Sequence, residues 1–163
     1  MGQLRRRVAA VLIVFGALWA IGQALARRRT VGDETSDEFE LASYLGGASW
    51  TSTAASLRRG VVRVCCGGVD LDLRPAVLDP SGATLELSPM WGGVNVTVPR
   101  GWRVLVDDRS TLGGVDARVT PHDELPGDAP LLRVSVSARL GGAAMRAADP
   151  AGDVHHLRGW TTA

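Results

Sequence analysis

A Gly-Gly pair recurs five times along the chain, and this repeat constrains the fold more than any other feature of the sequence. Successive pairs are separated by 21, 25, 21 and 28 residues. Internal periodicity of this length is typical of stacked structural units. Glycine suits a sharp corner because it adopts positive φ without a steric penalty. The pairs occupy positions 46/47, 67/68, 92/93, 113/114 and 141/142.

The residues after each pair alternate between apolar and polar with the period of a β-strand. Alternating runs also precede the pairs, at 62–66 and 132–140. The apolar set after the pairs is expected to face a core: Val69, Leu71, Leu73, Val94, Val96, Val98, Val115, Ala117 and Val119. The polar set is expected to face water: Asp70, Asp72, Asn95, Thr97, Asp116 and Arg118.

Each repeat is therefore predicted to consist of a strand, a glycine corner and a second strand. A unit this short cannot bury its apolar side alone, whereas stacked units bury a continuous column. We predict an all-β domain at 41–147, a single-stranded β-helix or β-solenoid of about five short coils. Residues 148–163 are expected to form a flexible tail. An antiparallel β-sandwich, with the glycine pairs at hairpin corners, stays open as an alternative.

An uncharged apolar run precedes the repeats. Residues 8–26 form 19 consecutive uncharged positions, which as a helix span ~28 Å and nearly match a bilayer core. Arginine triplets flank the run at 5–7 and 27–29. We predict a basic, cytoplasmic flank and one transmembrane helix within 1–29, followed by an acidic linker at 30–40. A cleaved signal peptide and a buried soluble helix are the alternatives, and the flanking charges do not decide the side of the domain.

The charge balance limits the partners of the domain. Residues 30–163 carry 12 arginines and 17 acidic residues, a formal balance of −5. Nucleic-acid binding requires a basic face, so it is not expected. Lysine is absent from the chain, which excludes Schiff-base chemistry. Cys65 and Cys66 are adjacent and are expected to act as small apolar residues on opposite faces of a strand.

No catalytic, cofactor or metal site is predicted, and an enzyme is not expected. The histidines, His122, His155 and His156, lack the spacing of zinc ligands. A column of Asp70, Asn95 and Asp116 offers oxygen ligands to calcium, but the calcium-binding nonapeptide of β-helices is absent. No serine lies in a nucleophile elbow. An envelope hydrolase dependent on Asp70 or His122 is kept only as a weak alternative. Trp50 and Trp102 are expected to pack in the core or at corners.

Three segments carry a resemblance to a known family: CCGGVDLDL at 65–73, LELSPMWGGVNVTVPRGWRV at 85–104 and TLGGVDARV at 111–119. Over residues 44–146 the chain resembles the C-terminal domain of LiaF-like, cell-wall-active antibiotic response proteins of bacteria. The resemblance implies a right-handed β-helix on a membrane protein that senses or restrains an envelope-stress signalling system, commonly beside a sensor histidine kinase. It implies no catalytic residues. The chain departs from the family in its single apolar run and in having an aromatic residue before only one glycine pair, Trp91.

Taken together, the sequence predicts a non-enzymatic regulatory or interaction protein of the bacterial cell-envelope stress response, held in the cell membrane by a single pass. Its expected partners are the lipid bilayer, through the N-terminal helix, and a sensor histidine kinase or another membrane protein. A second copy of the chain, in a homo-oligomer, is the third candidate partner. The alternative function is a self-assembling β-solenoid scaffold at the membrane, because an uncapped end exposes strand edges.

Overall fold

The computed structural model describes residues 30–149 and six residues of the N-terminal segment, namely 13, 14, 16, 17, 20 and 21. These six residues are helical. Most of the predicted transmembrane helix at 8–26, and the predicted tail after Asp149, lie outside the described residues. Among the residues that are described, no helix is both long and apolar enough to cross a membrane.

Residues 30–149 form a seven-stranded sheet with one short 3-10 helix, η1 (His122–Glu124). Every pair of named strands is parallel. The predicted all-β class is therefore confirmed, and the antiparallel sandwich is wrong. β1 begins three residues before the predicted domain boundary. The strands are β1 (Glu38–Thr51), β2 (Arg59–Asp72), β3 (Ala83–Pro99), β4 (Arg103–Asp108), β5 (Leu112–Arg118), β6 (Leu131–Val136) and β7 (Leu140–Ala148).

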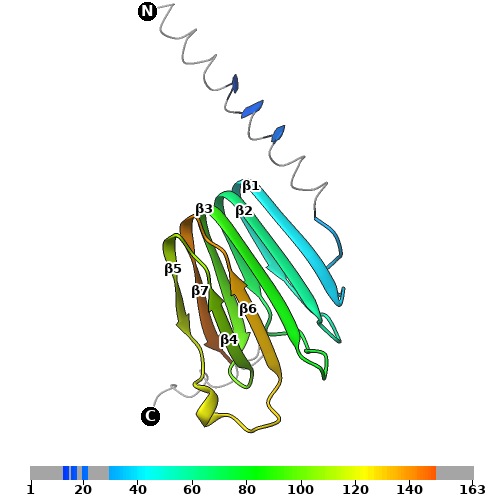
Figure 1. Cartoon of the computed structure of the whole chain (residues 1–163). Helices are drawn as coiled ribbons and strands as arrows, with labels where there is room; N and C mark the ends of the chain where they lie inside the picture. The colour runs from blue at the N-terminus through cyan, green and yellow to red at the C-terminus, as the bar shows by residue number, and fades with distance from the viewer. Residues whose placement is uncertain (1–12, 15, 18–19, 22–29, 150–163) are drawn as a thin grey trace, which may run out of the picture.

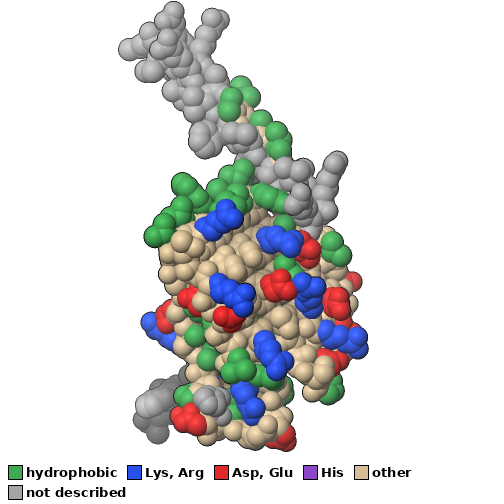
Figure 2. Space-filling model, in the orientation of Figure 1, with side chains coloured by type: hydrophobic (Ala, Val, Ile, Leu, Met, Phe, Trp, Pro, Cys, Tyr) green, Lys and Arg blue, Asp and Glu red, His purple; other side chains and the backbone are tan. Residues whose placement is uncertain are grey.

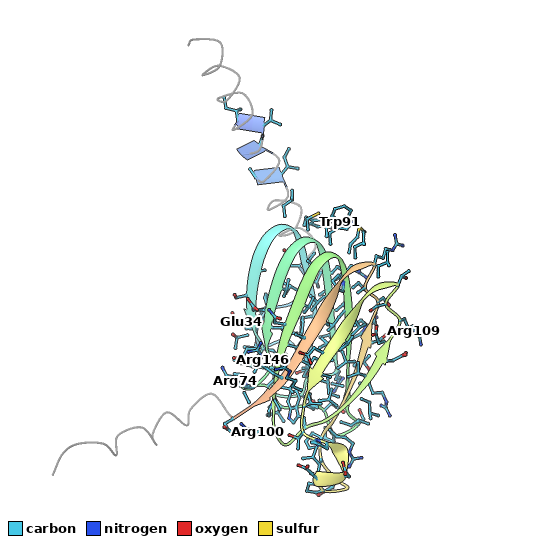
Figure 3. All side chains as sticks on the ribbon, turned by 90° about the vertical axis from the view of Figure 1, so that its left-hand side faces the viewer. Glu34, Arg74, Trp91, Arg100, Arg109 and Arg146 are labelled. Carbon is cyan, nitrogen blue, oxygen red and sulfur yellow. The ribbon has the colours of Figure 1, made fainter. Side chains whose placement is uncertain are left out.

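The long strands bend sharply at their glycine pairs, and Figures 1 and 3 show them as arches. We call the part before each pair the first limb and the part after it the second limb. In β1, the ring of Phe39 on the first limb lies 6.0 Å from the ring of Trp50 on the second. The two limbs therefore enclose a core between them. The linking loops add a short third side, where Leu57 and Leu78 form a parallel bridge.

The five sequence repeats correspond to five units: β1, β2, β3, β4 with β5, and β6 with β7. Their order in space differs from their order in the chain. First limbs neighbour one another in the order β1-β2-β3-β6-β4, and β7 lies between β3 and β5. The fifth unit is therefore inserted between the third and the fourth. Local periodicity does not predict this exchange, because it specifies strands and not their partners.

The core is a continuous apolar column between the limbs. Val69, Leu71 and Leu73 are buried as predicted, and so are the three valines of 94–98. Trp102 is buried, and Trp50 packs against the core. The fourth unit differs, because Ala117 is exposed and Val115 and Val119 are only half-buried. This unit forms one end of the stack, so nothing in the described sheet covers its far side.

The first glycine of the second to fifth pairs is required by close backbone packing. Gly67 and Gly92 have φ of 139° and 136°. A Cβ on Gly67 would lie 1.9 Å from the carbonyl oxygen of Gly46, and one on Gly92 would lie 1.8 Å from that of Gly67. Most second glycines are less confined, since a Cβ on Gly68 would meet its nearest atom at 3.8 Å; the exception is Gly142, where a Cβ would lie 2.6 Å from the carbonyl oxygen of Gly114. The paired glycines therefore have unequal roles.

Candidate interaction surface

The strands β4 and β5 expose a sheet edge at one end of the stack. Among the described strands, β4 pairs only with β6, and β5 only with β7. The amides of Arg103 and Arg109 donate to carbonyls on the β6 side. Because N–H directions alternate along a strand, the amides of Val104, Val106 and Asp108 point away from β6. This open edge presents backbone donors and acceptors to a further strand.

The side chains beside this edge add apolar surface and charge. Leu105 and Val106 are exposed, whereas Val134 and Leu85, the counterparts of Val106 in the inner units, are buried. They border a shallow hollow of about 340 Å³, which is also lined by Asp107, Arg109 and Arg133. An extended peptide on this edge would therefore meet both apolar and charged side chains.

The opposite end of the stack is partly covered by residues 30–37. Val31 and Glu40 exchange two backbone hydrogen bonds of 2.9 Å in an antiparallel bridge on β1. The amide of Thr53 donates to the carbonyl of Glu34 at 2.6 Å. The segment predicted to be a solvated linker thus also protects the β1 edge. The two ends of the stack are therefore unequal, because one is bridged in part and the other is not bridged by any described residue.

A row of apolar side chains lies along the outer side of the corners. The residue before each glycine pair is in register with the same residue of the neighbouring units. We call this row the apolar ridge: Leu45, Cys66, Trp91, Leu140 and Leu112. Its four large members are 40–63% exposed. In Figure 2, hydrophobic side chains gather at this end, and Figure 3 places Trp91 there.

The flat outer face carries charges that are largely paired within the domain (Figure 2). Arg59 bonds to Glu86 at 2.7 Å, and Arg63 pairs with Glu40. On the second limbs, Asp72 binds Arg74 through three side-chain hydrogen bonds of 2.7–3.1 Å. These hydrogen bonds lower the pKa of Asp72. Because these charges are paired with one another, the outer face offers few free charges to a charged ligand.

The three oxygen-bearing side chains considered for calcium are not contiguous. The amide of Asn95 donates to the carboxylate of Asp70 at 2.8 Å. Asp116, however, is separated from Asn95 by Ala144, because β7 lies between β3 and β5. The small residues of β7 form the floor of a depression of about 500 Å³ at this point. Within the described residues, no group of three or more potential metal ligands is found.

Cys65 and Cys66 lie side by side rather than on opposite faces. Their sulfur atoms are 3.8 Å apart and unbridged. The strand bends at this corner, so the alternation expected of a flat strand is lost. Hydrogen bonding to the neighbouring sulfur raises the pKa of the Cys65 thiol, with further contributions from burial and from the charge of Cys66. A raised pKa keeps Cys65 in the thiol form, which is the less nucleophilic one.

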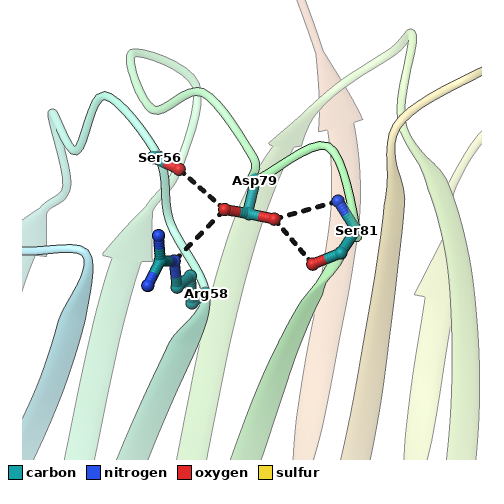
Figure 4. Close-up of polar contacts among 4 residues, drawn as sticks. All are labelled: Ser56, Arg58, Asp79 and Ser81. Carbon is teal, nitrogen blue, oxygen red and sulfur yellow. Dashed lines mark hydrogen bonds and ion pairs between the residues drawn. The ribbon is translucent and has the colours of Figure 1, made fainter.

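Asp79 joins two turns at the end away from the corners (Figure 4). Its carboxylate accepts hydrogen bonds from the amide and hydroxyl of Ser81 at 2.9 and 2.6 Å, and from Ser56 at 3.0 Å. Arg58 lies 3.1 Å away. These donors hold the pKa of Asp79 well below its ordinary value, with Ser81 as the largest cause. The cluster therefore has a structural role, because it links the turns of two successive units.

The remaining residues considered for chemistry are dispersed. Asp70 lies on β2 and His122 begins η1. His155 and His156 lie outside the described residues. Within the described residues, the open edge and the apolar ridge are the main candidate surfaces. Exposed strand edges at an uncapped end were predicted from the sequence, although the strands that form the edge were not, and the ridge was not predicted. The ridge had a sequence signal, since every residue before a glycine pair is apolar. No protein-family model, curated protein or solved structure matches the chain.

Proposed function

We propose that this chain is a membrane-anchored, non-enzymatic regulatory protein that binds other proteins of the bacterial cell envelope through the open edge of β4 and β5. The proposal rests on the difference between the two ends of the stack of strands. At one end, residues 30–37 bridge β1 at Glu40 and so block part of that edge, whereas no described residue bridges the outer side of β4 and β5. Strand addition supplies affinity through backbone hydrogen bonds, and the neighbouring side chains supply selectivity.

The finer architecture belongs to the same proposal. We infer a right-handed β-solenoid of five coils in which the fifth coil is inserted before the fourth. Parallel in-register pairing of the units supports it, as does the strong preference of parallel crossover connections for the right-handed form. The apolar run at 8–26 is proposed to be a single transmembrane helix, which confines the domain near membrane partners and raises its effective concentration.

The stress-response role rests on the resemblance of residues 44–146 to LiaF-like proteins, and a sensor histidine kinase is the proposed partner. The test uses crosslinking in intact membranes of cells that express the full chain. The variants Val106→Pro and Val106→Ala both remove the same side chain, but only proline removes the edge N–H and its strand-pairing capacity. Far-UV circular dichroism of each purified variant verifies that its strands are retained.

We expect a kinase or another envelope protein to crosslink to the wild type and to the alanine variant, and to be lost from the proline variant. Equal crosslinking of the two variants would exclude the β4/β5 edge as the binding surface. The absence of any crosslinked envelope protein from the wild type would argue against the regulatory role as a whole.

The second candidate is a self-assembling scaffold, favoured by the same open edge. Head-to-tail stacking would have to break the bridge between Val31 and Glu40, whereas two open edges would meet in a closed dimer. Sedimentation of the full chain in detergent distinguishes the two outcomes. Long, concentration-dependent polymers would favour the scaffold, while monomers or dimers favour the regulatory protein.

A further inference from the structure

We propose that the apolar ridge is a lipid-contacting surface, which inserts into the interfacial layer of the bilayer beside the N-terminal helix. The inference rests on the membrane anchoring in the proposed function and adds an orientation to it. The domain would stand with its glycine corners on the membrane and its loop end pointing away. The ridge consists of Leu45, Cys66, Trp91, Leu140 and Leu112, as defined above.

The ridge is unusual because its apolar side chains are contiguous. Single exposed apolar residues are normal on a protein surface, but a continuous row marks a contact site. Here five neighbouring strands contribute one residue each, and Met90 beside Trp91 is also exposed. Trp91, Leu140 and Leu112 remain at least 46% exposed. We therefore expect the ridge to contact something outside the domain.

The direction of the chain brings the apolar run toward this surface. The bridge between Val31 and Glu40 is antiparallel. From Val31 back to Thr30, the chain therefore points in the direction in which β1 advances from Glu40 toward the corner at Gly46. Figure 1 shows the described helical residues beyond this bent end of the strands.

The length of the connection agrees with this direction. Ala26, the last residue of the apolar run, is five positions before Val31, and Leu45 on the ridge is five positions after Glu40. Extended chain covers ~3.3 Å per residue, so each stretch spans at most ~17 Å. The end of the apolar run can thus reach the level of the ridge. A bilayer that holds this run lies within reach of the corners.

The chemistry of the ridge fits a lipid interface better than a protein groove. Tryptophan is enriched at the membrane interface because its ring is apolar and its N–H is polar, and Trp91 lies centrally in the row with Leu140 beside it. Arg139 precedes Leu140 and is exposed, and residues 27–29 are all arginine. Cations next to an apolar row favour anionic headgroups. The helical residues Ile13, Val14 and Ile21 are also at least 56% exposed, so they do not cover the ridge.

The test places a bimane fluorophore on the full chain in vesicles of phosphatidylcholine and phosphatidylglycerol, with some lipids brominated near the glycerol. In a Cys65→Ser/Cys66→Ser background, Leu112→Cys puts the label on the ridge. Gly101→Cys is the matched control, because a Cβ there meets no atom within 4 Å and Arg100 beside it lies at the end away from Trp91 (Figure 3). We expect lipid bromines to quench the ridge label several-fold more than the control label.

A second variant links this quenching to the ridge itself. Trp91→Ser/Leu140→Ser removes two exposed side chains and is expected to lower quenching at Leu112→Cys to the control level, while flotation with vesicles is unchanged. Equal quenching at both label sites in a chain that floats would overturn the inference and leave the anchoring intact. A chain that does not float would overturn both. Protection of the ridge label from aqueous iodide without lipid quenching, and only at high protein density, would assign the ridge to contact between copies and overturn the lipid proposal.

Discussion

Replacing each glycine of one corner by alanine, one at a time, tests whether the two glycines contribute unequally to stability. Gly67 has φ of 139°, and its added Cβ would lie 1.9 Å from the backbone oxygen of Gly46. Gly68 lacks a positive φ, and its added Cβ would meet its nearest atom at an ordinary 3.8 Å. Gly67→Ala should therefore destabilise the domain strongly, and Gly68→Ala should not.

The magnitude follows from the backbone contact. Carbon and oxygen atoms approach to ~3.3 Å at closest in parallel strands, so Gly67→Ala requires β1 and β2 to move apart by roughly 1.4 Å or the corner to change its φ. The conformational penalty for alanine is about 1–2 kcal/mol. Loss of two adjacent ladder hydrogen bonds adds about 1–3 kcal/mol. We expect unfolding to cost about 3 kcal/mol less, and the Tm to fall by roughly 10–15 °C.

The assay is urea unfolding of the full chain in detergent micelles, followed by far-UV circular dichroism and by tryptophan fluorescence. Gly68→Ala is expected to change the free energy of unfolding by less than about 1 kcal/mol, since it also restricts the unfolded chain. Equal losses for the two variants would refute the argument that only the first glycine is held against a neighbouring backbone. An unchanged stability for Gly67→Ala would refute the corner geometry itself.

Three further predictions follow from burial and hydrogen bonding. Leu132→Ala, at a side chain 0% exposed, should lower the free energy of unfolding by about 2–5 kcal/mol, whereas Leu140→Ala, at one 46% exposed, should cost less than about 1 kcal/mol; similar losses in urea titrations would contradict the assigned core. The lowered pKa of Asp79 means that its cluster stabilises the fold above the unfolded carboxyl pKa of about 3.9 and loses this contribution as pH falls through the folded value. Asp79→Asn should therefore lower the Tm at pH 7 and narrow the gap to wild type below about pH 4; a gap that is constant with pH would exclude this role. Cys66→Ala removes the sulfur that raises the pKa of Cys65, so the pH midpoint of Cys65 alkylation should move down, and an unmoved midpoint would disprove the coupling.

The strand faces of the inner units were predictable from the sequence because alternation is a local property. Val94, Val96 and Val98 are buried, whereas Asn95 is exposed, in agreement with the period of two. The glycine pairs likewise marked the corners. The alternation failed for Cys65 and Cys66, since it assumes a flat strand and these residues lie where the strand bends.

The order of the units was not predictable, because alternation does not specify which strand pairs with which. Only a weak signal distinguished the fourth unit from the fifth. Residues 103–118 carry several charges, including the adjacent Asp107, Asp108 and Arg109, whereas 131–148 is richer in apolar and small residues. The more apolar fifth unit occupies the interior position and the more charged fourth unit the open end. The open edge could not be predicted before this exchange was known.

The insertion of the fifth unit also determines when the domain can be completed during synthesis. The first three units can pair as they leave the ribosome, each on its predecessor. Residues 103–118 then have no strand to join, because β6 and β7, their partners, begin at Leu131 and Leu140. A nascent chain that stops short of these residues would keep its fourth unit undocked, and the binding edge would not exist. The open end of the molecule is therefore assembled last, after residues 131–148 have paired with β3.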